Sequence, residues 1–91
     1  MNSIKGICKA AREAIDRHDY GTALRLCEMG LEMDDSYYML LVFRALALQN
    51  LERKEEAVLS YRQAAKSQPD QILAWQVLLT ELIIDLFLYF H

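Results

Sequence analysis

Residues 57–69, AVLSYRQAAKSQP, repeat the pattern of residues 23–35, ALRLCEMGLEMDD, at a distance of 34 positions and without a gap. The aligned pairs are Ala23 with Ala57, Leu24 with Val58, Cys27 with Tyr61, Gly30 with Ala64 and Asp35 with Pro69. Small residues recur where paired helices must approach each other, and larger residues recur where the space between helices must be filled. A fixed period of this length predicts a stack of helical repeats.

The first half of the unit occurs a third time near the end of the sequence. A shift of 34 positions places Leu41 on Trp75, Ala45 on Leu79 and Leu48 on Leu82. We therefore expect a first repeat over residues 4–37, a second over residues 38–71 and a third, cut off after its first helix, over residues 72–91. These units are predicted to stack into one all-α domain.

Apolar residues at helical spacing predict about five helices, over residues 3–17, 21–33, 36–50, 54–67 and 70–90. Polar side chains that can accept hydrogen bonds from the free amides of a helix start stand at four of these starts: Ser3, Asp19, Ser36 and Asp70. Pro69 is expected to stop the helix that precedes it. The pattern therefore predicts antiparallel helices joined by short turns.

The sequence resembles the tetratricopeptide repeat family in the motifs Trp75-x2-Leu78 and Ala57-x3-Tyr61-x2-Ala64, followed by Pro69. This resemblance implies an α-α superhelix of antiparallel helix pairs that acts as a protein–protein interaction module. Within the family, residues 9–28 (KAAREAIDRHDYGTALRLCE) and 60–76 (SYRQAAKSQPDQILAWQ) are similar to the N-terminal repeats of superkiller complex scaffold subunits. The similarity implies a scaffold that holds an RNA helicase and a WD-repeat subunit and supports messenger RNA decay from the 3′ end by the cytoplasmic exosome.

In this family the first helix of each repeat lines a concave groove. The resemblance implies these groove residues: Lys5, Lys9, Arg12, Met39, Val42, Phe43, Leu46, Gln49 and Gln76. A basic cluster beside an apolar strip suits a peptide that carries an acidic end and a few hydrophobic anchors. Two alternatives stay open. The cations could belong to an ordinary solvated helix face, paired with Glu13 or Asp16, and the apolar residues could be buried against neighbouring helices.

Composition argues against several other functions. The net charge is −3, and nucleic-acid modules concentrate Lys and Arg, so we expect no direct binding to nucleic acid. The only histidines are His18, in a predicted turn between helices, and His91, at the end of the sequence, and neither has a plausible set of catalytic or metal-ligating partners. We therefore expect no enzyme, no catalytic or metal site and no cofactor. Cys8 and Cys27 are expected to be reduced thiols, with Cys27 a small buried side chain.

The C-terminal stretch from residue 72 to residue 90 is strongly apolar. Glu81 and Asp85 within it disfavour a membrane anchor, because central carboxylates are costly in a bilayer, and a tail-anchored adaptor stays a minor alternative. Self-association, for example a homodimer through residues 72–91, is predicted to use an uncovered apolar face made of Ile83, Leu86, Phe87 and Phe90. The first residues do not form a signal peptide, and we expect a cytoplasmic location, with the nucleus as a second one.

Overall fold

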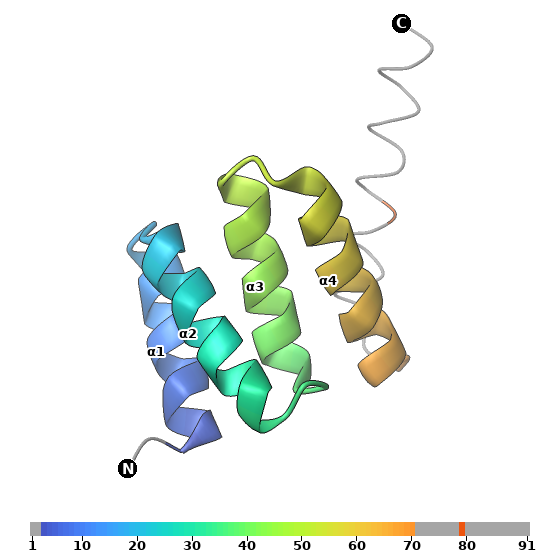
Figure 1. The fold of residues 1–91 in the computed structure, drawn as a ribbon, viewed down its shortest axis with the longest axis horizontal. Helices are drawn as coiled ribbons and strands as arrows, with labels where there is room; N and C mark the ends of the chain where they lie inside the picture. Colours follow the sequence, from blue (N-terminus) through green and yellow to red (C-terminus); the bar gives the residue numbers. More distant parts are fainter. Residues whose placement is uncertain (1–2, 71–78, 80–91) are drawn as a thin grey trace, which may run out of the picture.

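The computed structural model describes residues 3–70 and residue 79. Residues 3–70 form four α-helices: α1 (Ile4–Asp16), α2 (Tyr20–Met33), α3 (Tyr38–Asn50) and α4 (Lys54–Ser67). Each helix packs antiparallel against the next one along the chain, and α1 also contacts α3 (Figure 1). The predicted all-α antiparallel stack is confirmed. The helix predicted over residues 70–90 and the self-association face within it lie outside the described residues.

The 34-residue period of the sequence is also a period of the backbone. Helix α3 begins and ends 34 residues after α1, and α4 begins and ends 34 residues after α2. The turns repeat as well, since the Asp19 amide donates to the Ala14 carbonyl over 2.8 Å and the Arg53 amide donates to the Leu48 carbonyl over 2.9 Å. The repeat boundaries at residues 4–37 and 38–71 stay a prediction, because one period can be counted from several origins.

Two of the predicted helix caps are confirmed and one is wrong. The Ser3 hydroxyl accepts from the Gly6 amide over 3.1 Å, and the Asp19 carboxylate accepts from the Thr22 amide over 3.3 Å. Ser36 does not cap α3, and its amide and hydroxyl both donate to Asp34 Oδ1 instead. This local turn moves the helix start to Tyr38, with Tyr37 as the N-cap residue. The helix that Asp70 would cap lies outside the described residues.

Helix α3 lies at the centre of the four helices and is buried on nearly all sides. Its buried residues are Tyr38, Leu40, Leu41, Val42, Phe43, Ala45, Ala47 and Leu48. The other helices bury a single stripe, such as Ile7, Ala11 and Ala14 of α1, which recur at intervals of three to four residues. The aligned residues Cys27 and Tyr61 are both fully buried, so the small thiol of the first repeat occupies the place of a packed aromatic ring in the second.

Candidate peptide-binding groove

A cavity of about 550 Å³ lies between α1 and α3. Its lining residues are Lys5, Cys8, Lys9 and Arg12 of α1, the N-cap residue Tyr37, and Met39 and Phe43 of α3. We call this cavity the groove. Lys5, Lys9 and Arg12 share one helix face because they are three to four residues apart. Five of the residues predicted for a ligand surface, Lys5, Lys9, Arg12, Met39 and Phe43, are thus brought together by the fold.

The basic side of the groove consists of Lys5, Lys9 and Arg12, all of which are exposed. The expected alternative was local pairing with Glu13 or Asp16. Within residues 3–70, however, the single ion pair joins Arg53 to Glu56, far from the groove in sequence. The three cations therefore face the groove without a carboxylate partner among the described residues. Their positive potential is available to a ligand.

The opposite side of the groove is apolar. Phe43 is 9% exposed, whereas Tyr37 and Met39 are half-buried and present part of their surface to the cavity. Sequence reasoning missed Tyr37, because the family pattern counts groove positions from within the first helix of a repeat and this residue precedes α3. A tyrosine near the start of a predicted helix could have indicated this position. Tyrosine is often found where its ring is packed and its hydroxyl contacts solvent.

The remaining predicted groove residues do not line this cavity. Val42 is 1% exposed and lies in the core, in agreement with the burial alternative. Leu46 is partly buried and packs against the same core. The Gln49 side-chain oxygen accepts a hydrogen bond from the Tyr61 hydroxyl over 3.2 Å, which holds it against α4. Gln76 lies outside the described residues.

The groove contains one thiol, Cys8, whose pKa is raised by partial burial despite the nearby Arg12 guanidinium. Burial also raises the pKa of Cys27 to about 12, and both cysteines are free. His18 stacks on Tyr20 in the α1–α2 turn, with the ring centres 5.8 Å apart. Within the described part of the chain, no three His, Cys, Asp or Glu side chains are grouped closely enough to hold a metal ion. The chemistry of the groove is therefore that of charge, apolar contact and a neutral thiol.

Comparison with known proteins agrees with this architecture. The chain is similar to proteins of the tetratricopeptide repeat family. It is 41% identical over 73 residues to tetratricopeptide repeat protein 37 of Xenopus laevis and 39% identical over 73 residues to superkiller complex protein 3 of Homo sapiens, matches that cover 80% of the chain. It is also 30% identical to superkiller protein 3 of Saccharomyces cerevisiae over 98% of the chain. No protein-family profile matches the sequence.

The matched region is a small part of each relative. The chain spans 5% of the length of the two vertebrate proteins and 7% of the yeast protein. None of the helices that the structure describes combines the length and the hydropathy needed to cross a bilayer.

Proposed function

We propose that this chain is a protein-interaction module whose groove between α1 and α3 binds a peptide segment with acidic side chains and apolar anchors. The observation that carries the proposal is the arrangement of Lys5, Lys9 and Arg12, unpaired among the described residues, opposite the apolar side chains of Met39 and Phe43 in one cavity. Unpaired cations steer an acidic ligand toward the site. Burial of an apolar anchor then supplies most of the affinity.

The experiment compares two variants of the full chain by isothermal titration with an acidic, apolar peptide. In the first variant, Lys5, Lys9 and Arg12 are replaced by Gln, which removes the charge and keeps most of the side-chain stem. In the control, Gln replaces three exposed cations that line no described cavity: Arg17, Arg25 and Arg62.

We expect the groove variant to lose about tenfold in affinity, because each exposed charge contributes less than about 1 kcal/mol. The control should lose less than about twofold, because its charges lie away from the bound peptide. Equal losses in both variants would show that net charge, rather than the groove, attracts the peptide, and that result would contradict the proposal.

We further propose that the module serves as part of a scaffold in a superkiller-type complex. Support comes from its identity with relatives named as superkiller proteins in Homo sapiens and Saccharomyces cerevisiae. On this proposal, its partners are an RNA helicase and a WD-repeat subunit, its process is exosome-linked messenger RNA decay, and its location is the cytoplasm. The chain then contributes protein contacts and leaves RNA chemistry to its partners.

Immunoprecipitation of the tagged full chain from a cytoplasmic extract tests this second proposal. Mass spectrometry should recover the helicase or the WD-repeat subunit with the wild-type chain, at a level that falls when Lys5, Lys9 and Arg12 are replaced by Gln. Recovery of neither subunit would contradict the superkiller role. The peptide-binding proposal would survive that result, because it depends on the titration alone.

A further inference from the structure

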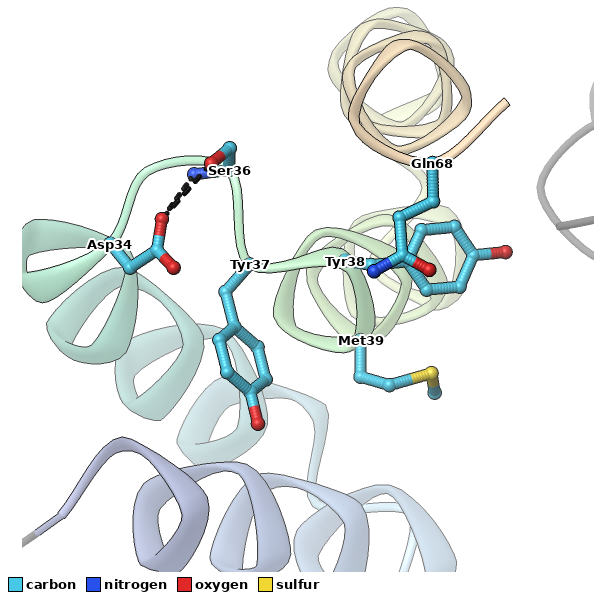
Figure 2. A pocket seen from close by; sticks show the side chains of 6 residues that line it. All are labelled: Asp34, Ser36, Tyr37, Tyr38, Met39 and Gln68. Carbon is cyan, nitrogen blue, oxygen red and sulfur yellow. Dashed lines mark hydrogen bonds between the residues drawn. The ribbon is translucent and has the colours of Figure 1, made fainter. Parts of the chain in front are cut away.

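A second cavity, of about 450 Å³, adjoins the groove at the N-terminal end of α3. It is lined by Asp34, Ser36, Tyr37, Tyr38, Met39 and Gln68. Two of these residues, Tyr37 and Met39, also line the groove, so the two cavities meet at their side chains. Figure 2 shows both side chains projecting from the start of α3 on the side that faces α1. We call this second cavity the rim cavity.

The rim cavity is held in place by hydrogen bonds within the loop between α2 and α3 and between this loop and α4. Asp34 Oδ1 accepts from the Ser36 amide over 3.1 Å and from the Ser36 hydroxyl over 3.0 Å. The Ser67 hydroxyl at the end of α4 donates to the Ser36 carbonyl over 2.7 Å. These bonds tie the loop between α2 and α3 to α4. The Asp34 carboxylate is therefore fixed at the cavity wall, although it is exposed to solvent.

The two cavities carry opposite charge. Among the residues that the structure describes, the lining of the groove has three cations and no carboxylate, whereas the lining of the rim cavity has one carboxylate and no cation. The start of α3 also lies at the rim cavity and brings a partial positive charge of about half an elementary unit. The full negative charge of Asp34 exceeds that partial charge. The potential therefore changes sign between the two cavities, across Tyr37 and Met39.

We propose that the groove and the rim cavity together select a bipolar segment of a partner protein, with acidic residues, an apolar centre and basic residues in succession. The acidic residues lie beside Lys5, Lys9 and Arg12, the apolar centre contacts Tyr37 and Met39, and a lysine or arginine lies beside Asp34. This inference rests on the proposed peptide-binding function and adds the charge order of the ligand. A segment that is acidic throughout is disfavoured, because its far end would face the Asp34 carboxylate.

The test uses three synthetic peptides and the full chain. Each peptide begins with three glutamates and continues with a Leu-Phe-Leu centre, and the peptides end in three lysines, three glutamines or three glutamates. Fluorescence anisotropy at physiological salt gives their relative affinities. We expect the lysine-ended peptide to bind about threefold tighter than the glutamine-ended peptide, and the glutamate-ended peptide to bind weakest.

Two single-charge variants separate the rim cavity from net charge. Asp34→Asn keeps a side-chain carbonyl that can accept from Ser36 and removes the charge, so the preference for the lysine-ended peptide should disappear. Asp35→Asn removes the same charge one residue away, from a side chain that lines neither the groove nor the rim cavity, and should keep the preference. Circular dichroism checks that both variants stay helical.

The outcomes distinguish the two levels of the proposal. Equal binding of all three peptides, or equal effects of Asp34→Asn and Asp35→Asn, would overturn the bipolar ligand and leave peptide binding in the groove intact. Failure of every peptide to bind would overturn the proposed function and this inference together. A further variant, Gln68→Glu, adds a second carboxylate to the rim cavity and should increase the preference for the lysine-ended peptide.

Discussion

Cys27 has no exposed surface, and burial raises its pKa to about 12. Because the thiolate is the reactive form, we expect a thiol reagent at pH 8 to modify Cys8, which is partly exposed, and to leave Cys27 unmodified in the folded chain. Mass spectrometry of the labelled protein checks this result. Addition of denaturant should make both cysteines react. Rapid labelling of Cys27 without denaturant would show that the contact between α2 and its neighbours opens readily.

The same residue makes stability depend on pH above neutrality. In the unfolded chain the Cys27 thiol ionises near its ordinary pKa of 9.0, whereas in the folded chain it stays protonated up to about pH 12. The unfolded state therefore binds fewer protons in this range, and the free energy of unfolding falls as pH rises from 9 toward 12. At pH 10 the expected loss is about 1.4 kcal/mol relative to pH 8. Urea unfolding should show that this loss is absent from Cys27→Ser.

Two non-glycine residues adopt left-handed backbone conformations. His18 has φ of 61° and Glu52 has φ of 62°, at equivalent turns after α1 and α3. Such a conformation costs an ordinary residue about 1–2 kcal/mol, while glycine loses about 0.5–1 kcal/mol in chain entropy on folding. Glu52→Gly should therefore stabilise the chain by about 0.5 kcal/mol. A matched change in the first turn of α4, Glu55→Gly, should destabilise it by up to about 1 kcal/mol. A lower Tm for Glu52→Gly in thermal unfolding would contradict the account.

At the level of helices, Gly30 marks the closest approach of α2 to its neighbours. A Cβ at this position would lie 2.5 Å from Leu40 Cδ1 and 3.2 Å from Ile7 Cγ2. Leu40 is fully buried, so its side chain would have to move within the packed core. We expect Gly30→Ala to destabilise the chain by about 1–3 kcal/mol through overpacking, as measured by urea unfolding.

Gly21, in the first turn of the same helix, is the control for this prediction. A Cβ there would meet nothing within 4 Å, so Gly21→Ala should stabilise the chain by up to about 1 kcal/mol through helix propensity alone. Stabilisation by both substitutions would contradict the tight packing of α2 against α1 and α3 at Gly30.

The helices were largely predictable from the sequence because their apolar residues recur at helical spacing and their period is constant. Observed and predicted helix ends differ by at most two residues within the described part of the chain. The largest difference is at α3, where Asp34 and Ser36 form a local turn and the helix begins two residues later than predicted, at Tyr38. The residue types do not predict which of the two hydrogen-bond patterns forms, because Asp and Ser are favoured both in turns and at helix caps.

At the scale of the whole molecule, the groove was only partly predictable. The basic face of α1 follows from the spacing of Lys5, Lys9 and Arg12, and all three side chains are exposed. The groove residues of α3 were harder to predict, because this helix contacts three others. Val42, which was predicted to line the groove, is therefore part of the core. The rim cavity could not be predicted, because Asp34 and Gln68 are brought together by the stacking of α4 beside the loop that precedes α3.

If the proposed function is right, a bound peptide lies in the groove between α1 and α3. A nitrogen–proton correlation NMR titration of the full chain with the lysine-ended peptide would report it residue by residue. We predict that the largest shift changes fall on Lys5, Cys8, Lys9, Arg12, Tyr37 and Met39. The exposed residues Glu55 and Glu56 of α4 should be unchanged. Largest changes on the outer surface of α2 and α4, with the groove residues unaffected, would contradict the account.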